Sequence, residues 1–274
     1  MYITNRPEVA LIAEDAGVDR IFVDMEYIGK AARQGGMDTV QSHHSIEDVK
    51  TLRATITKAE LLVRVNPIHD ATEEATSSET EIEQVIEAGA DIIMLPFFQN
   101  ASQVRRFLQA VHRRCKTILL FETPEAIANL QEILALPDID EVYIGLNDLS
   151  LGYGKRFMFE LLADGTVERI ALAFREKNLT FGFGGIAAIG TGTLPAEAIL
   201  KEHYRLGSSM VILSRSFCDS SKVTDMDILR ETFCTGIGAM RAYEKEIVPH
   251  SSYFSQNQRF VQQCVQKILA SMAK

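Results

Sequence analysis

The sequence predicts a (β/α)8 barrel that is followed by extra C-terminal helices. Short β-rich runs alternate with amphipathic stretches through residues 1–222. Eight such runs are present, and most are continuously apolar, which is typical of parallel strands covered on both faces. Eight strand–helix units in a chain of 274 residues fit one closed barrel better than an open doubly wound sheet.

The first half of the chain supplies four predicted strands, over 1–4, 20–24, 61–65 and 91–95. Pro7 opens a helix after the first strand because proline is favoured in a first helical turn, and Gly17 ends this helix. Ser45 is the expected N-cap of the next helix, and Asp48 is its partner three residues later. A helix over 79–88 stops at Gly89, and the stretch 71–80, rich in Glu, Ser and Thr, is expected to be a surface loop.

The second half supplies the predicted strands 117–121, 141–145, 180–184 and 210–213. Helices are predicted over 102–114, from Thr123 with Pro124 in the first turn, over 167–177, and over 194–206 with Gly207 as the stop. From about Val223 onward the chain is predicted to be helical. We therefore expect a barrel core over residues 1–222 and C-terminal helices over 223–274.

Apolar residues recur near the carboxyl end at three- and four-residue spacing: Val261, Cys264, Val265, Ile268, Leu269 and Met272. This spacing predicts a helix with one apolar face. The face can pack on its own barrel or on a neighbouring subunit. Because the C-terminal segment is longer than one covering helix requires, we expect a homo-oligomer formed through this helix.

Charge and composition exclude several classes of partner. The chain has 28 basic and 37 acidic residues, a net charge of −9, and its basic residues are scattered, which argues against nucleic acid. No apolar run approaches the ~18 residues of a membrane span, and the N-terminus lacks the pattern of a signal peptide. The four cysteines lie far apart without Cys-x-x-Cys spacing, so we expect reduced thiols in a cytoplasmic protein.

Polar residues follow most of the predicted strands, where a barrel carries its active site. In chain order they are Asp24, Glu26, Arg64, Asn66, Glu122, Asn147, Asp148, Gly184, Gly185, Ser214 and Arg215. Four carboxylates and two arginines thus converge on one rim. Carboxylates without histidine or cysteine ligands favour a hard divalent cation, so Mg²⁺ or Mn²⁺ is the expected cofactor.

These charged residues also have structural alternatives. Asp148 can cap the turn that begins there. Glu122 can serve only the positive end of the helix that opens at Thr123. Arg64 can be a plain ion-pair partner of Glu26.

The glycine-rich stretch 182–190 has two interpretations as well. Its backbone N–H groups, at Gly184 and Gly185 among others, can bind a phosphate or carboxylate at the rim of the barrel. Alternatively, its glycines only allow close packing. The match to a dinucleotide fingerprint is weak, because such a motif recurs by chance and here lies inside a late strand.

Several short strings together resemble those of the HpcH/HpaI aldolase and citrate lyase β-subunit family. They are Asp24–Glu26, Val63–Asn66, Glu87–Asp91, Met94–Pro96, Phe121–Ala126 and Ile144–Ser150. They occur in consistent order within roughly residues 1–220. Any one of these strings is a weak signal, whereas several of them at matching barrel positions are specific.

The resemblance implies a metal-dependent barrel that breaks a carbon–carbon bond of pyruvate-type 2-oxo acids, with an aldehyde as a possible second partner. Glu122 and Asp148 would then bind Mg²⁺ or Mn²⁺. Arg64 would hold the 2-oxo or enolate oxygen, because an enolate in a site of low polarity requires fixed positive charge. Barrels of this family exchange a C-terminal helix between subunits, which also points to a homo-oligomer.

One position departs from the pattern of the aldolase branch, which carries an acid/base histidine close after Asp-x-Glu. This sequence has Tyr27 there, and an unperturbed phenol, with a pKa of about 10, is a poor base. A metal-bound water, or His44 delivered by its loop, is the expected proton acceptor. Alternatively, His43 and His44 are only loop and helix-start residues. The catalytic candidates are therefore Arg64, His44 and Glu26.

Substrate contacts are expected from Arg64, Asn147, Gly184 and Gly185. Taken together, these patterns predict a lyase of the class II aldolase type. Three alternatives stay open: an acyl-CoA lyase of the malyl or citramalyl type, a non-catalytic barrel that binds a 2-oxo acid, and a phosphosugar isomerase or synthase that uses the glycine-rich rim.

Overall fold

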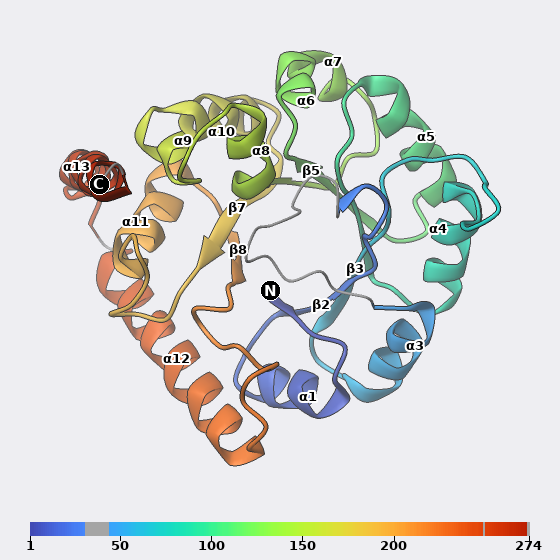
Figure 1. Ribbon diagram of the computed structural model, residues 1–274, viewed down its shortest axis with the longest axis horizontal. Coiled ribbons are helices and arrows are strands. Elements are labelled where there is room, and N and C mark those ends of the chain that lie inside the picture. The colour runs from blue at the N-terminus through green and yellow to red at the C-terminus, as the bar shows by residue number, and fades with distance from the viewer. Residues whose placement is uncertain (31–43, 249, 273–274) are drawn as a thin grey trace. The chain divides into compact units, whose positions relative to one another are not determined.

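Figure 1 shows a computed structural model of the chain, which describes residues 1–30, 44–248 and 250–272. Eight strands follow one another in sequence order around a closed barrel. The pairs β1–β2, β2–β3, β3–β4, β4–β5 and β7–β8 are parallel. The predicted (β/α)8 fold is therefore confirmed. Within the described ranges, no helix is long and apolar enough to cross a membrane.

The strands are β1 (Tyr2–Ile3), β2 (Arg20–Asp24), β3 (Glu60–Arg64), β4 (Ile92–Leu95), β5 (Lys116–Phe121), β6 (Glu141–Ile144), β7 (Thr180–Ile186) and β8 (Met210–Leu213). The helices are α1 (Pro7–Asp15), α3 (Ile46–Thr55), α4 (Ser78–Glu87), α5 (Ala101–Val111), α6 (Pro124–Ala128), α7 (Leu130–Ile133), α8 (Leu146–Gly152), α9 (Glu160–Ala163), α10 (Thr166–Glu176), α11 (Ala196–Leu206), α12 (Met226–Ile247) and α13 (Phe254–Met272).

Local start and stop signals act largely as the sequence predicts. The Ser45 side chain accepts from the Asp48 backbone N–H while the Asp48 carboxylate accepts from the Ser45 N–H, so the capping box forms with Asp in place of Glu. Gly207 ends α11 in the left-handed conformation, with φ +82°. α5 ends three residues earlier than the predicted 102–114, because His112 and Arg113 have positive φ angles that stop the helix.

Other boundaries also differ. α4 begins at Ser78, inside the stretch 71–80 that was expected to be a loop, because Ser77 caps it. β7 extends to Ile186 instead of ending at 184. The short helices α7, α8 and α9 were not predicted, since four to seven residues are too few for a helical period to show.

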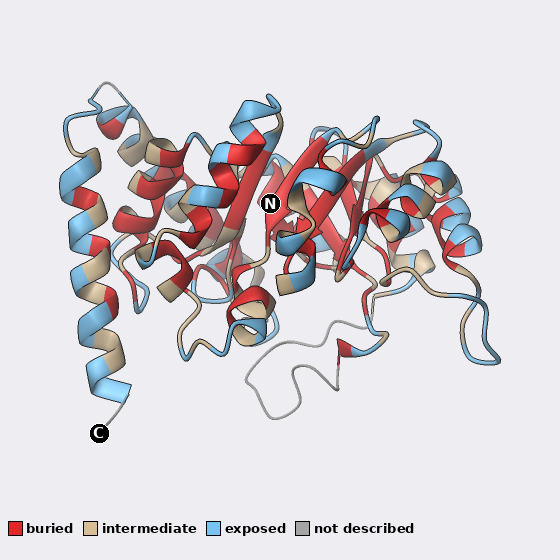
Figure 2. Cartoon of the chain, turned by 90° about the horizontal axis from the view of Figure 1, so that it is seen from above, coloured by how far each residue is buried: buried red, intermediate tan, exposed pale blue. Residues whose placement is uncertain are grey.

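Most strands are buried on both faces, as their continuous apolar runs predict, whereas three of the four residues of β8 are only partly buried. Ile92, Ile93, Met94 and Leu95 of β4 are all fully buried. In Figure 2 the strands are red and the outward faces of the helices carry most of the pale blue, exposed residues. The free energy gained by burying these aliphatic side chains supports the barrel.

The chain groups into two compact units, residues 1–14 with 18–143 and residues 15–17 with 144–274. The expected division after residue 222 is untested and stays a prediction. All four cysteines are free thiols, as expected.

α13 packs on its own unit through a polar anchor and part of its apolar face. The buried Asn257 amide donates to the Ala198 carbonyl at 3.0 Å and to Glu202 Oε1 at 2.8 Å. Val261 and Val265 are buried, whereas Met272 is 50% exposed. The expected oligomer through this helix stays a prediction.

Candidate functional site

A buried charge cluster occupies the carboxyl ends of β2 and β3. Asp24 ends β2, Arg64 ends β3, and the two residues are register partners. Arg64 donates from Nε to Asp24 Oδ1 and from Nη2 to Asp24 Oδ2, both at 2.8 Å. Lys30 Nζ donates to the same Oδ2 at 2.7 Å. The Asp24 and Lys30 side chains are only 2% and 5% exposed, so the cluster is desolvated and depends on its internal pairing.

The charges in this cluster hold one another in the ionised state. Burial opposes ionisation of the Asp24 carboxyl, but the Arg64 and Lys30 cations outweigh it and hold the pKa of Asp24 well below its usual range. Burial likewise disfavours the Arg64 cation, but Asp24, Glu26 and Glu122 raise the pKa of Arg64 above its ordinary value. Asp24 and Arg64 therefore stay charged across the physiological pH range.

Glu26 completes the cluster. Its side chain is 1% exposed, and its Oε2 lies 3.4 Å from Arg64 Nη1 and 3.6 Å from Lys30 Nζ. The sequence allowed Arg64 to be a plain partner of Glu26. The shorter, bidentate contact is instead to Asp24, so the guanidinium plane is set by Asp24 and only one edge faces Glu26.

The loop after β2 is fastened to β3 by Asn66. Its side-chain Oδ1 accepts from the backbone N–H groups of Tyr27 at 2.9 Å and Ile28 at 3.0 Å. Its Nδ2 donates to Glu81 Oε1 at 2.8 Å, and both side chains are buried. This fixes residues 25–30 over the end of the strand. Tyr27, which stands at the position of the expected histidine, is 51% exposed.

His44 lies against the end of β2, where a loop-borne histidine was expected. Its Nδ1 accepts the Asp24 backbone N–H at 3.0 Å. A ring that accepts at Nδ1 carries its proton on Nε2 when neutral. In this arrangement His44 can donate a hydrogen bond from Nε2, and it can take up a proton only after it releases the Asp24 amide. His43 lies outside the described residues.

Glu122 follows β5 as a buried carboxylate, 3% exposed. Its Oε1 accepts the Phe97 backbone N–H at 3.0 Å, and Phe97 has φ +48°, an uncommon left-handed conformation for a residue other than glycine. The helix α6 is capped by Thr123, whose hydroxyl accepts from the Ala126 N–H at 3.1 Å. Capping of α6 is therefore the role of Thr123, and Glu122 accepts a hydrogen bond from the loop after β4.

Asp148 and Asn147 lie in the first turn of α8, directly after β6. Both are partly buried, and Ser150 Oγ donates to the Asn147 carbonyl at 2.7 Å. Asp148 belongs to the second compact unit and Glu122 to the first. In the described part of the chain, no group of three or more His, Cys, Asp or Glu residues is arranged to hold a metal.

Gly184 and Gly185 both lie inside β7, whereas the sequence predicts that this strand ends at Gly184. The register with β8 shifts between Gly182 and Gly185. Gly184 has φ +59°, and a Cβ there would lie 2.8 Å from Leu146 Cδ1, so this position requires glycine for conformation and packing. A Cβ on Gly185 would meet nothing closer than 3.6 Å. Of these two glycines, close packing therefore explains Gly184 and does not explain Gly185.

The stretch from Asp24 to Arg33, with Lys30, resembles the acyl-CoA lyase branch, but Lys30 was not among the site residues predicted from the sequence. It lies four residues after Glu26 and six after Asp24, in a loop whose path no local periodicity predicts. A basic residue soon after an Asp-x-Glu motif was the available signal.

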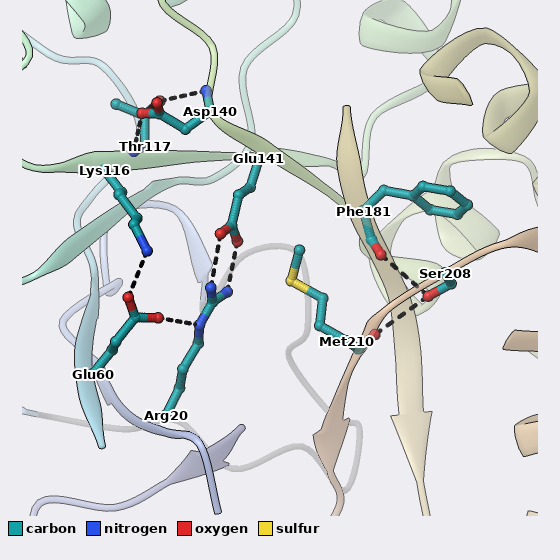
Figure 3. Close-up of polar contacts among 9 residues, drawn as sticks. All are labelled: Arg20, Glu60, Lys116, Thr117, Asp140, Glu141, Phe181, Ser208 and Met210. Carbon is teal, nitrogen blue, oxygen red and sulfur yellow. Dashed lines mark hydrogen bonds and ion pairs between the residues drawn. The ribbon is translucent and has the colours of Figure 1, made fainter. Parts of the chain in front are cut away.

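A second ionic network lies at the amino ends of the strands (Figure 3). Arg20 donates to both Glu141 oxygens, at 2.6 and 2.7 Å, and to Glu60 Oε2 at 2.9 Å. Lys116 Nζ donates to Glu60 Oε1 at 2.6 Å. Each of these four residues is the first of its strand, β2, β3, β5 or β6.

A cavity of about 450 Å³ opens beside this network, at the end of the strands opposite Asp24 and Arg64. Its charged walls pair with neighbours, Lys116 with Glu60 at 2.6 Å and Arg113 with Asp138 at 3.0 Å. We therefore place the candidate site at the carboxyl ends of the strands, where a barrel carries its chemistry.

Comparison with known proteins identifies the family of the chain. The model of the HpcH/HpaI aldolase/citrate lyase family matches residues 2–183. A 2-dehydro-3,6-dideoxy-6-sulfogluconate aldolase of Pseudomonas putida is 27% identical over 164 residues, which cover 49% of this chain and 56% of the relative. The match thus spans little more than half of that relative's length.

Two solved structures are similar in fold. An HpcH/HpaI aldolase from Desulfitobacterium hafniense has a TM-score of 0.57 at 16% identity, over 88% of this chain and 91% of the other. An HpcH/HpaI aldolase/citrate lyase family protein from Burkholderia cenocepacia has a TM-score of 0.56 at 16% identity, over 90% and 94%.

Proposed function

Because the chain belongs to the HpcH/HpaI aldolase/citrate lyase family, we propose that it is a carbon–carbon lyase acting on pyruvate-derived 2-oxo acids through an enolate. The observation that carries this proposal is the buried guanidinium of Arg64, held in one orientation by Asp24 at the carboxyl ends of the strands. The relative from Pseudomonas putida is named an aldolase for a 2-dehydro sugar acid, which supports the same substrate class.

The reaction breaks the bond between carbons three and four of the substrate. The proton acceptor takes the 4-hydroxyl proton as C4 becomes an aldehyde carbonyl, the electron pair of the C3–C4 bond moves into the C2–C3 bond, and negative charge develops on the 2-oxo oxygen. Protonation of this enolate at C3 then gives pyruvate. We propose that Arg64 holds this oxygen through Nη1, the nitrogen that does not contact Asp24 and that lies 3.4 Å from Glu26 Oε2, because a cation with little solvent access stabilises a developing oxyanion strongly. Asp24 keeps the fork oriented, so little reorganisation is needed as the charge develops.

The proposed cofactor is Mg²⁺ or Mn²⁺, held by Glu122 and Asp148. Glu122 suits such an ion, because it is a buried carboxylate and Mg²⁺ commonly takes only one or two protein carboxylates. When bound, the cation supplies Lewis-acid polarisation of the 2-oxo group. Phe97 orients Glu122 by donating to one of its oxygens.

His44 is proposed to donate a hydrogen bond to the substrate from Nε2. Its Nδ1 accepts the Asp24 amide, so a role as base requires the ring to leave that contact. Glu26, buried beside Arg64, is the remaining catalytic candidate. Gly185 and Asn147 are proposed substrate contacts. We also propose a homo-oligomer that forms through α13.

The test is release of pyruvate from a panel of 4-hydroxy-2-oxo acids and malyl-type thioesters, with and without Mn²⁺. We expect release from the hydroxy-oxo acids, loss with chelator and recovery with Mn²⁺ or Mg²⁺. Release from the thioesters alone would identify an acyl-CoA lyase. Release from neither, with pyruvate still bound, would identify a non-catalytic barrel. Activity in thoroughly metal-stripped protein would contradict the cofactor.

A further inference from the structure

We propose that Lys30 is a positioning residue that balances the charge of Asp24 and Glu26, so that the Arg64 cation acts on an anionic substrate. This inference rests on the proposed function and gives a role to a residue outside the proposed catalytic, substrate-binding and metal-binding set. Three observations carry it: the burial of Lys30, its two acidic neighbours, and the sharing of Asp24 with Arg64.

Lys30 is fixed by its surroundings on both its backbone and its side chain. Its backbone N–H donates to the Tyr27 carbonyl at 3.2 Å, and its side chain is 5% exposed. Nζ lies 2.7 Å from Asp24 Oδ2 and 3.6 Å from Glu26 Oε2. A lysine is seldom buried in this way unless it is paired, and its long side chain loses much rotamer freedom in one geometry. The cluster therefore holds its second cation at a considerable cost.

Charge arithmetic shows what that second cation does. Asp24 and Glu26 supply two negative charges, and Arg64 and Lys30 supply two positive charges, all within 3.6 Å contacts. Glu122 adds a further negative charge that acts on Arg64. Without Lys30, Arg64 is the single cation that faces Asp24 and Glu26, so the summed charge of these three residues is negative. A 2-oxo acid carries a carboxylate, so a net-negative cluster with little solvent screening would repel it.

The geometry favours this electrostatic role over a covalent one. A lysine that attacks a carbonyl must be a neutral amine, which usually requires an apolar pocket or a neighbouring cation. Lys30 instead faces two carboxylates, at 2.7 Å and 3.6 Å, and its Nζ donates to the nearer one, so its surroundings are not an apolar pocket. We therefore assign Lys30 to positioning and charge balance, with Arg64 as the residue that contacts the substrate.

The experiment measures pyruvate binding by calorimetry in the presence of Mn²⁺, with pyruvamide as a neutral probe of the same shape. Wild type is compared with Lys30→Met, Lys30→Arg, Glu26→Gln and the double variant Lys30→Met/Glu26→Gln. Thermal unfolding checks that each variant is folded at the working temperature. Binding, and not turnover, is the readout because Glu26 is itself a catalytic candidate.

We expect Lys30→Met to weaken pyruvate binding roughly 10- to 100-fold, and pyruvamide binding much less. Lys30→Arg should stay within a few-fold of wild type. The double variant restores a balance of one anion and one cation, so it should recover most of the lost affinity. Glu26→Gln alone should bind pyruvate at least as tightly as wild type. This last variant keeps the proposal testable if Lys30→Met does not fold.

The outcomes separate the two proposals. Wild type that binds no pyruvate would overturn the proposed function and this inference with it. Wild type that binds pyruvate, while Lys30→Met binds it equally well, would overturn only the role of Lys30. Equal losses of pyruvate and pyruvamide, without recovery in the double variant, would show that Lys30 only supports the loop structurally.

Discussion

The amino and carboxyl ends of the β2–β3 pair carry the same kind of interaction, but the two interactions serve different purposes. Arg20 faces Glu60 at the amino ends, and Asp24 faces Arg64 at the carboxyl ends, both as register partners. At the amino end Glu60 and Lys116 are 35% and 50% exposed, while Arg20 and Glu141 are 14% and 10% exposed. At the carboxyl end Asp24 is 2% and Lys30 5% exposed.

The amino-end network and the carboxyl-end cluster differ in burial, and this difference indicates that the first supports the fold and the second serves function. At the amino end, opposite charges on β2, β3, β5 and β6 bridge neighbouring and more distant strands, and water screens part of the network. At the carboxyl end, two cations and two anions are packed where solvent cannot screen them. A buried ionic cluster is weak evidence for stability, because desolvation opposes its Coulomb energy. Such a cluster is better explained by a chemical task.

The largest expected effect comes from making the same Arg→Lys substitution at the carboxyl and at the amino ends of the strands. Arg64→Lys keeps the charge but loses the bidentate fork, and we expect kcat/KM to fall by about 2–4 kcal/mol of transition-state stabilisation. Arg20→Lys, the matched control on β2, should leave kcat/KM within a few-fold. Pyruvate release under saturating Mn²⁺ measures both. Equal losses would mean that Arg64 is as structural as Arg20.

A second pair of substitutions compares carboxylates. Glu122→Gln removes a charged ligand, so we expect Mn²⁺ affinity to fall on the order of 10- to 100-fold or more, by analogy with the loss of an outer-shell partner. Glu141→Gln, a buried carboxylate at the amino end of β6, should leave Mn²⁺ affinity unchanged while it lowers stability. Calorimetric titration of both variants decides the matter. Normal metal binding by Glu122→Gln would remove it from the ligand set.

The stability of the protein in acid reports on a third buried group, His203. His203 is stacked on Phe183, its Nδ1 lies 2.8 Å from Ser208 Oγ, and Ser208 in turn donates to the Phe181 carbonyl (Figure 3). Burial lowers the pKa of His203 to about 3. Asp24 and Glu60 have lowered pKa values, so their contributions are lost only as the pH falls below the ordinary carboxyl range.

The sign for His203 is the reverse of a salt-bridged histidine. The unfolded chain binds its proton near pH 6.5, whereas the folded chain does not bind it until about pH 3. Stability is therefore full above pH 6.5 and falls toward pH 3, by about a few kcal/mol. Denaturant unfolding between pH 7 and pH 5 should show this loss, and His203→Phe should flatten it. An equally steep loss in the variant would assign the acid lability elsewhere.

The smallest expected effect is at the exposed edge of the amino-end network. Lys116 is 50% exposed, so Lys116→Met should cost no more than about 1 kcal/mol of unfolding free energy and leave activity unchanged. Urea unfolding at low and high salt measures the effect, which should shrink as salt rises. A loss that salt does not change would mean that the pair is less screened than its exposure indicates.

The sequence alone determined most of the architecture. Apolar runs and start and stop signals are local properties, so the strands and the longer helices could be predicted from the order of residues. The identity of the charged rim also followed, because residues after parallel strands converge on one edge. Thus Asp24, Arg64 and Glu122 could be selected without coordinates. Short helices such as α8 could not be predicted, since they span too few residues to show a period.

Only the tertiary structure decided the partners. Arg64 makes its bidentate contact with Asp24 and not with Glu26, because the β2–β3 register pairs it with Asp24, which is 40 residues away in the sequence. The tautomer of His44 depends on an amide 20 residues away. Lys30 enters the cluster because a loop folds back over β2, and Gly184 is required by Leu146. The physical reason is common to all four: a pairwise contact depends on the distance and orientation of two groups in space, and local periodicity encodes neither.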